Sequence, residues 1–250
     1  MWHTVPEKHC VALRARDSFA AKRKQAATPH LACAARGQHL AAELLKIDPA
    51  HPDPVQLRYA AHFLERGCVL AVPTDTVYGL AADPFNLAAI DEIFHVKGRP
   101  EVRGLPILVN SMDMAQMLAR SAPQNFLRLA KAFWPGALTL VVDASHRVPL
   151  KVTANTRRIA LRWPHCKVLE SLIDEFGGPV TGTSANISGH PVCPSADDVL
   201  VQLGARLPLV LDAGETGATL ASTIVELHGD TWKIAREGAI TAADIQSALG

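Results

Sequence analysis

The sequence contains no run of 18 consecutive apolar residues, and aromatic side chains make up only 5% of its 250 residues. The first absence excludes an ordinary membrane-spanning helix. Because 48% of the residues are nevertheless hydrophobic, aliphatic side chains and alanine must supply most of a buried core. This composition predicts a globular chain rather than a disordered one, with no membrane partner.

Cysteine is scarce and its spacing is irregular. The cysteines are odd in number and no two have the CxxC spacing: Cys10, Cys33, Cys68, Cys166 and Cys193. No HExxH motif occurs, and no pair of histidines has metal-ligand spacing near other ligands. We therefore expect neither a disulfide framework nor a metal site built from protein ligands, and we expect a reducing, cytoplasmic location.

The familiar nucleotide-binding and nucleophile motifs are also missing. The absence of GxxxxGK[ST] and of GxGxxG excludes a Walker-type phosphate loop and the usual dinucleotide-binding turn. The segment Gly182–Asn186 approaches the GxSxG nucleophile elbow, but Asn186 occupies the place of the last glycine. Since that strained turn needs small residues, the pattern weighs against a serine hydrolase.

Charge is nearly balanced over the whole chain, with a formal net charge of +1, but it is divided unevenly. Residues 1–43 hold seven basic and three acidic side chains, and residues 44–250 hold 18 basic and 21 acidic ones. The two parts therefore carry +4 and −3. The negative balance of the larger part argues against strong, sequence-independent RNA binding.

The basic stretch 1–43 lacks the apolar core and small-residue cleavage site of a signal peptide. Its arginine- and alanine-rich character loosely suggests a transit peptide, but Glu7 and Asp17 weaken that interpretation. We expect an N-terminal extension over residues 1–43 that is either disordered or partly helical around Phe19–Lys24 and Leu40–Leu45, followed by one domain over residues 44–250.

Strands and helices alternate in the pattern of residues 44–250. Strands are predicted at Cys68–Pro73, Leu105–Val109, Ala137–Asp143, Ile159–Trp163, Pro179–Thr183, Leu209–Asp212, Thr223–Glu226 and Trp232–Arg236. Helices are predicted from Pro54 to Gly67, from Asn86 to Gly98, from Ser111 to Phe133 with a break near Ser121–Pro123, and at His165–Phe176, Ser195–Leu203 and Thr241–Leu249. Because several late strands follow one another directly, the pattern favours an α/β domain with a mixed sheet.

Polar clusters follow several of these elements. Thr74, Asp75 and Thr76 come at the end of the first strand, where ligands bind in open α/β sheets. A turn whose hydroxyls satisfy local backbone groups is the commoner reason for such a cluster. The three residues are therefore candidates to line a pocket, with a structural turn as the alternative.

A second cluster contains Lys97, Arg99 and Arg103, around a loop that Gly98 and Pro100 exclude from a helix. Arginine binds phosphate oxygens in a bidentate manner and lysine acts as a point charge, so three such cations can converge on one anion. The alternative is a solvated basic loop, which is usual for an isolated KxR.

The segment Gly182–Asn186, which continues into Ile187–Gly189, carries small hydroxyl and amide side chains. Such a loop can present backbone N–H groups and hydroxyls to a phosphate or a nucleobase edge. Arg162, Ser222 and Arg236 add cations and a hydroxyl at other strand ends. A single arginine is more often a surface or ion-paired residue than a ligand. Together these residues indicate a small, anionic, phosphate-bearing substrate.

Several ordered motifs carry a resemblance to a known family. They are PTDTVYGL from Pro73, KGRP from Lys97, WPGALT from Trp134, RWPH from Arg162, TSANISG from Thr183, Ser222-Thr223, and REGAI from Arg236. With them, residues 46–240 resemble the YrdC-like family of threonylcarbamoyl-adenylate synthases. The resemblance implies a twisted, open α/β fold with a concave, basic-lined pocket. It also implies a nucleotidyltransferase that joins L-threonine, bicarbonate and ATP into threonylcarbamoyl-AMP and releases pyrophosphate.

The resemblance assigns roles to individual residues. Lys97 and Arg99 are the implied catalytic residues, acting through their charge. The implied ATP contacts are Lys97, Arg99, Arg103, Ser184, Asn186 and Arg236, and the implied threonine contacts are Thr76, Arg162, Gly182, Thr183 and Ser222. Mg²⁺ is expected on the phosphates of ATP, while tRNA and the proteins that transfer the threonylcarbamoyl group to it are indirect partners.

Four positions depart from the family pattern. Arg103 stands where lysine or asparagine is common, Leu108 where some relatives have a histidine near the substrate, Arg158 where threonine is common, and Val192 where some relatives have serine. Two alternatives to the enzyme remain: a YrdC-like paralogue that binds RNA or nucleotide without making an adenylate, and an RNA-binding module. The intact KxR and SAN patterns favour the enzyme, since the paralogues lose both.

Overall fold

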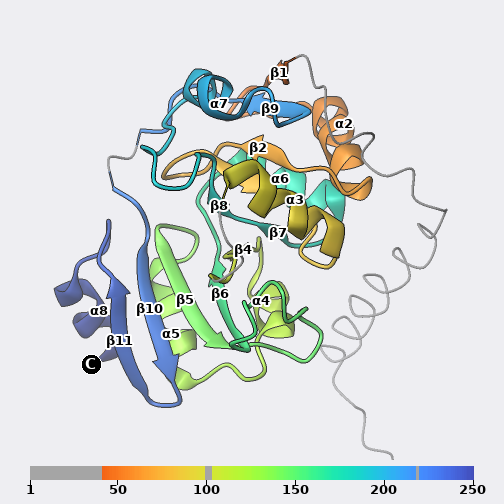
Figure 1. The fold of residues 1–250 in the computed structure, drawn as a ribbon. Coiled ribbons are helices and arrows are strands. Elements are labelled where there is room, and N and C mark those ends of the chain that lie inside the picture. The colour runs from red at the N-terminus through yellow and green to blue at the C-terminus, as the bar shows by residue number, and fades with distance from the viewer. Residues whose placement is uncertain (1–40, 99–102, 218–219) are drawn as a thin grey trace, which may run out of the picture.

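The computed structural model describes residues 41–98, 103–217 and 220–250, whose strands form two sheets (Figure 1). The first sheet has the spatial order β1 (Glu43–Lys46), β9 (Leu209–Asp212), β2 (Leu70–Val72), β3 (Gly79–Ala81) and β8 (Thr183–Ser184). The second has the order β11 (Thr231–Arg236), β10 (Thr223–His228), β5 (Leu138–Asp143), β6 (Arg158–Arg162), β4 (Ile107–Leu108) and β7 (Val180–Thr181). Each sheet contains parallel and antiparallel pairs, which confirms the predicted α/β class with mixed pairing.

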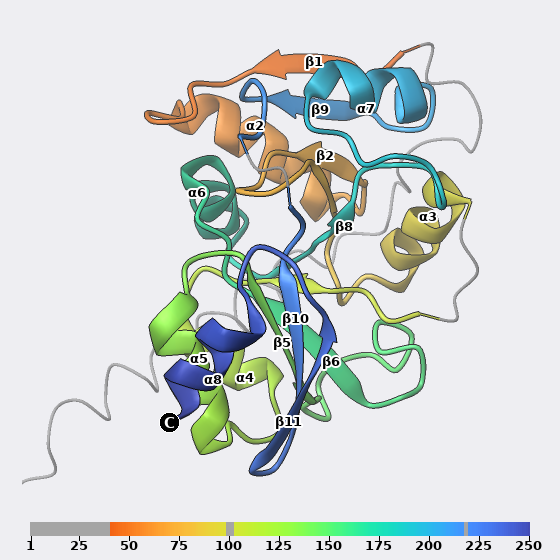
Figure 2. The same cartoon turned by 90° about the vertical axis from the view of Figure 1, so that its left-hand side faces the viewer.

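The helices of the described residues lie beside these sheets. They are α2 (Pro54–Glu65), α3 (Leu87–Lys97), α4 (Met112–Leu118), α5 (Gln124–Phe133), α6 (Lys167–Phe176), α7 (Ala196–Leu203) and α8 (Ala242–Leu249). Helix α2 packs on α6 beside the five-stranded sheet, and α5 packs on α8 beside the six-stranded sheet (Figure 2). Within the described ranges, no helix is both long enough and apolar enough to cross a membrane.

Local chemistry sets the helix ends where the sequence predicts them. Asp53 Oδ1 accepts a hydrogen bond from the Val55 backbone N–H at 2.7 Å and caps α2. Asn86 caps α3, which ends at Gly98 with φ 59°, a left-handed conformation that favours glycine. The end of α3 is therefore fixed one residue after Lys97.

The central strand β2 is buried on both faces. Leu70 and Val72 pack with α2 and α6, whereas Val69 and Ala71 face the larger core that reaches the six-stranded sheet. Burial on both faces explains why this strand is a continuous apolar run rather than an alternating one. The turn that follows β2 is consequently anchored by a rigid strand.

Gly182 marks the point where the chain passes from one sheet to the other. The predicted strand Pro179–Thr183 is divided there, since β7 pairs with β4 and β8 pairs with β3. Beside it, the Thr181 hydroxyl donates to the Leu80 carbonyl at 2.9 Å and accepts from the Ala82 N–H at 3.0 Å. This crossing brings the SAN segment to the edge of the five-stranded sheet.

The predicted helix around Leu40–Leu45 is wrong where the structure describes it, because Glu43–Lys46 form β1, parallel to β9. Most side chains of β1 are exposed, so no apolar alternation signals a strand, and backbone hydrogen bonds to β9 hold it in place. The strand begins one residue before the predicted boundary at 44. Residues 1–40, with the predicted helix Phe19–Lys24, lie outside the described residues.

Candidate functional site

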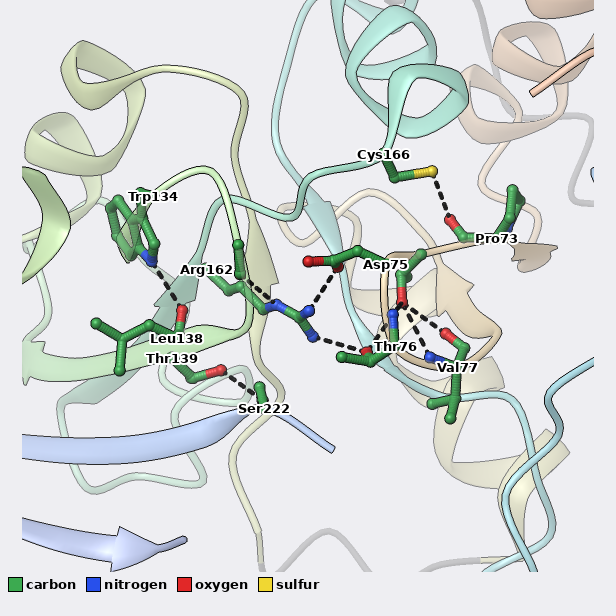
Figure 3. A network of polar contacts seen from close by, with 12 residues as sticks. Pro73, Asp75, Thr76, Val77, Trp134, Leu138, Thr139, Arg162, Cys166 and Ser222 are labelled. Atoms are coloured by element: carbon green, nitrogen blue, oxygen red, sulfur yellow. Dashed lines mark hydrogen bonds and ion pairs between the residues drawn. The ribbon is translucent and has the colours of Figure 1, made fainter. Parts of the chain in front are cut away.

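Thr74 shapes the turn that follows β2. Its Oγ1 donates to the Val77 carbonyl at 2.7 Å and accepts the backbone N–H groups of Thr76 and Val77 at 3.1 and 3.2 Å. Such a hydroxyl satisfies backbone groups that have left the sheet ladder. Thr74 is thus the structural part of the motif, and Asp75 and Thr76 point toward Arg162 (Figure 3).

Arg162 ends β6 and reaches across to this turn (Figure 3). Its Nη2 pairs with Asp75 Oδ1 at 2.5 Å, its Nη1 donates to Thr76 Oγ1 at 3.0 Å, and its Nε donates to the Gly136 carbonyl at 3.1 Å. The side chains of Arg162 and Asp75 are only 8% and 14% exposed. The predicted site residues Thr76, in the turn after β2, and Arg162, at the end of β6, are therefore in direct contact.

A second arginine, Arg236 of β11, lies near the first. Its Nη2 donates to the carbonyl and the hydroxyl of Ser222 at 2.7 and 3.1 Å. Ser222 Oγ lies 3.0 Å from Thr139 Oγ1, and both side chains are buried. Burial lowers the pKa of Arg236, and the charge of Arg162 lowers that pKa further. An anion placed near both guanidinium groups would relieve this repulsion.

Arg162 itself carries two opposing influences. Burial lowers its pKa, whereas the charge of Asp75 and the hydrogen bond to it raise it. Arginine remains protonated in proteins, so the pair is ionic rather than neutral. The site thus combines two cations, Arg162 and Arg236, with one carboxylate.

Lys97 joins two motifs that are far apart in the sequence. Its side chain is buried, and its Nζ donates to the carbonyls of Ser184 at 2.5 Å and Asn186 at 3.0 Å. Ser184 Oγ donates to Asn186 Oδ1 at 2.6 Å, and Asn186 Nδ2 donates to the His190 carbonyl at 2.7 Å. The KxR lysine therefore holds the SAN segment in a defined conformation.

The remaining predicted site residues are placed differently. Thr183 is buried in β8 opposite Leu80. Arg103 is exposed, and no described residue forms a hydrogen bond or ion pair with it. Arg99 lies outside the described residues. The structure therefore brings Lys97, Ser184 and Asn186 together, and separately Thr76, Arg162, Ser222 and Arg236.

Gly182 contributes close packing rather than a side chain. A Cβ at this position would lie 2.3 Å from Leu108 Cγ, and the Gly182 N–H donates to the Pro106 carbonyl at 2.8 Å. Leu108 is only 2% exposed. Leu108 therefore fills the space over Gly182 and offers no polar contact.

We predict that Gly182→Ala lowers the free energy of unfolding by about 1–3 kcal/mol, because the added methyl group overpacks this contact. Urea unfolding followed by circular dichroism measures the change. In a Leu108→Ala background the same substitution should cost measurably less, since the two sites are coupled by contact. Equal costs in both backgrounds would contradict the packing described here.

Two other departures from the family pattern lie away from these groups. Arg158 Nη1 pairs with Asp143 Oδ1 at 2.8 Å, and its Nη2 donates to the carbonyls of Val141 at 3.1 Å and Leu227 at 2.7 Å. Arg158 thus ties β6 to β5 and β10. Val192 is 49% exposed.

Two reactive side chains near the site have structural roles. Burial raises the pKa of Tyr78 to about 12, and its hydroxyl donates to the Gly214 carbonyl at 2.7 Å. Burial also raises the pKa of Cys166, whose thiol donates to the Pro73 carbonyl at 3.5 Å (Figure 3). Since the thiolate is the nucleophilic form, Cys166 is unsuited to covalent catalysis.

The cysteines also bear on the expected redox state. Among the described residues, Cys166 and Cys193 are free, whereas Cys68 is disulfide-bonded. A bond at Cys68 does not by itself make a disulfide framework, so the expectation that such a framework is absent stays a prediction.

Three polar groups of the site have contacts that the sequence does not predict. Asp75 is a predicted pocket residue without an assigned partner, and Thr139 lies in the WPGALT motif without an assigned role. The third group is the Gly136 carbonyl, a backbone atom that carries no residue-type signal. Only the tertiary contacts of Arg162 and Ser222 identify these groups.

The chemistry of the assembled groups is that of anion binding. The described parts of the chain contain no cluster of three or more His, Cys, Asp or Glu side chains that could hold a metal ion. Cations and hydroxyl groups predominate in the site instead. Such groups bind and orient a charged substrate and stabilise charge that develops during a reaction.

Comparisons with known proteins agree with this chemistry. A family model for Sua5, YciO and YrdC proteins, described as "Telomere recombination", matches residues 62–238. A threonylcarbamoyl-AMP synthase of Pyrococcus abyssi is 35% identical over 195 residues, covering 78% of this chain and 57% of the relative. A threonylcarbamoyl-AMP synthase of Bacillus subtilis is 37% identical over 201 residues, covering 79% of this chain and 57% of the relative. The chain thus spans less than two thirds of these curated relatives.

A solved structure is similar over the same region. The crystal structure of P. abyssi Sua5 complexed with L-threonine superposes with a TM-score of 0.81 at 33% identity, covering 84% of this chain and 61% of that protein. Since the family model covers well over half of the sequence, the chain belongs to the Sua5/YciO/YrdC family.

Proposed function

We propose that this chain is a threonylcarbamoyl-AMP synthase, which joins L-threonine, bicarbonate and ATP into threonylcarbamoyl-adenylate and releases pyrophosphate. The observation that carries the proposal is the buried contact of Lys97 with Ser184 and Asn186, which unites the two family motifs best suited to a triphosphate. The names of the curated relatives support the activity, and the threonine complex of P. abyssi Sua5 supports the amino acid.

The proposed ATP site lies around Lys97. Lys97 and Arg99 stabilise the charge that develops on the phosphates, and Ser184 and Asn186 contact the nucleotide. Arg236 lies toward the threonine site, so its proposed contact is with the end of the nucleotide that reacts. Arg103 completes the proposed set as an exposed cation.

The proposed threonine site lies around Arg162, whose guanidinium group is buried and held by three acceptors. A buried arginine is suited to a carboxylate, because it offers fixed donors in a weakly solvated setting. Thr76 and Ser222 supply hydroxyl groups beside it. Gly182 and Thr183 line the adjoining crossing between the sheets.

The reaction requires no covalent attachment to the protein. The amino group of threonine takes up bicarbonate as a carbamate with loss of water. A carbamate oxygen then forms a bond to the α-phosphorus, and the bond to the bridging oxygen breaks as pyrophosphate leaves. We therefore expect this chain to contribute in two ways: it positions the two substrates, and it places cations beside the phosphates.

Mg²⁺ is proposed only as a companion of ATP. Mg²⁺ in nucleotide sites is typically held by one or two carboxylates and by substrate phosphates. The described residues supply no metal-binding cluster, and Asp75 is already paired with Arg162. We therefore assign no residue of this chain as a metal ligand.

The proposed partners and cellular location follow from the chemistry of the product. Threonylcarbamoyl-AMP is an activated intermediate, so tRNA and the proteins that transfer its acyl group are proposed as indirect partners. A cytoplasmic location is proposed because ATP and tRNA are available there. A concave pocket lined by the cations Lys97, Arg162 and Arg236 is the proposed reaction chamber.

Pyrophosphate release by the purified chain tests the activity. We expect release only when ATP, L-threonine and bicarbonate are all present, and background release when any one is omitted. RNA binding with a steep salt dependence, without threonine-dependent pyrophosphate release, would instead favour the paralogue that makes no adenylate.

A further inference from the structure

Only one of the two carboxylate oxygens of Asp75 forms a hydrogen bond with a described residue. Oδ1 pairs with Arg162, and no described residue donates a hydrogen bond to Oδ2. Among the described residues, no buried side-chain oxygen or nitrogen lacks a partner. Oδ2 must therefore be open to solvent, although the side chain as a whole is only 14% exposed.

Arg162 has donors to spare beside this oxygen. A guanidinium group has five N–H donors. The Gly136 carbonyl, Thr76 Oγ1 and Asp75 Oδ1 each accept one of them, which leaves two N–H groups on the terminal nitrogens. The Asp75 carboxylate and the Arg162 guanidinium group thus lie side by side at a nearly buried position, and their ion pair fixes their relative orientation (Figure 3).

We propose that Asp75 binds the α-ammonium group of the amino-acid substrate through Oδ2, while Arg162 binds its carboxylate through the spare donors. The inference deepens the proposed function, on which it rests, by assigning the residue that recognises the amino group. A zwitterionic α-amino acid places both charges on one carbon, which matches two opposite charges in contact. Arg236 reinforces the arrangement, because its charge disfavours an ammonium group on its own side of Arg162.

The recognition makes the site selective for α-amino acids over other carboxylates. An arginine alone accepts any carboxylate, whereas a ligand that lacks an ammonium group would cover Asp75 Oδ2 without supplying the positive charge that compensates for the lost solvent. A hydroxyl-for-ammonium analogue of threonine keeps the carboxylate and the side chain but loses the charge. It should therefore bind more weakly than L-threonine.

Calorimetric titration of the full chain with two ligands tests the assignment. The ligands are L-threonine and its 2-hydroxy analogue, 2,3-dihydroxybutanoate, and the proteins are wild type, Asp75→Asn and Asp53→Asn. Asp53→Asn removes one carboxylate from an exposed helix cap, where asparagine serves equally well. We expect Asp75→Asn to weaken threonine about 10- to 100-fold, to change binding of the analogue by less than about threefold, and the control to change neither.

Equal weakening of both ligands would overturn the proposal, since Asp75 would then only orient Arg162. Unchanged threonine binding would overturn it too, as would a wild-type chain that binds the analogue as tightly as threonine. The last comparison needs no variant and stays decisive if Asp75→Asn fails to fold. A wild-type chain that discriminates between the ligands but releases no pyrophosphate would overturn the proposed function while leaving this assignment standing.

Discussion

Replacing Arg162 by leucine should nearly abolish the use of threonine. The guanidinium group is the meeting point of Asp75, Thr76 and the Gly136 carbonyl, and it is the proposed carboxylate ligand. Removing one member of a desolvated charge pair across an interface typically costs about 2–5 kcal/mol, so the KM for threonine should rise at least about 30-fold. Steady-state kinetics with threonine as the varied substrate measures the effect.

The same substitution should also destabilise the fold, because it leaves the Asp75 carboxylate nearly buried without its cation. Breaking a buried pair costs about 3–5 kcal/mol. The double variant Arg162→Leu/Asp75→Asn removes both charges, so it should recover part of the lost stability without recovering threonine use. Recovery of threonine use along with stability would contradict the binding role of Arg162.

Replacing Lys97 by methionine should remove most of the activity with ATP. Methionine keeps much of the length of the side chain but loses the ammonium group that is buried against the Ser184 and Asn186 carbonyls. A donor that stabilises developing charge is worth about 10²–10³-fold in rate, and we expect a loss of that size in kcat/KM for ATP. Pyrophosphate release at varied ATP concentration measures it.

Two comparisons separate this effect from misfolding. In Lys97→Met the Ser184 and Asn186 carbonyls lose their donor, which costs about 1–3 kcal/mol. The unfolding temperature should therefore fall without complete loss of the fold. Lys131→Met removes an exposed cation from the last turn of α5 and should leave activity nearly unchanged. If Lys97→Met retained wild-type kcat/KM for ATP, its proposed role in stabilising the phosphates would be wrong.

The parts of the fold that the sequence predicts well are those set by local chemistry. Asp53, Asn86 and Ser111 begin helices because their side chains cap backbone N–H groups within the same turn. Strand β1 could not be predicted in the same way, since its side chains are mostly exposed and its pairing with β9 lies far away in the chain. Strand β3 is short and overlaps the end of a motif whose polar residues suggest a turn.

One predicted strand is divided between the two sheets. Pro179–Thr183 has the composition of a single strand, yet the chain changes sheets at Gly182, where Leu108 leaves no room for a side chain. Such a crossing depends on a partner that is distant in sequence. Local propensity therefore predicts the strand but not its division.

The candidate site shows the same contrast. The residue types of Thr76 and Arg162 and their positions at strand ends predict that both are site residues. In the structure the two side chains are in contact. The sequence predicts Asp75 as a pocket residue, but its proposed role depends on its contact with Arg162 and on its solvent-exposed oxygen. Pairwise geometry of this kind has no signature in a single sequence.

Incorporation of labelled bicarbonate tests the central claim most directly. Purified chain is incubated with ATP, L-threonine and isotopically labelled bicarbonate, and the nucleotide products are separated and identified by mass spectrometry. We expect one labelled carbon in each threonylcarbamoyl-AMP, formed with an equal amount of pyrophosphate. Folded chain that binds ATP and threonine but yields no labelled adenylate would contradict it.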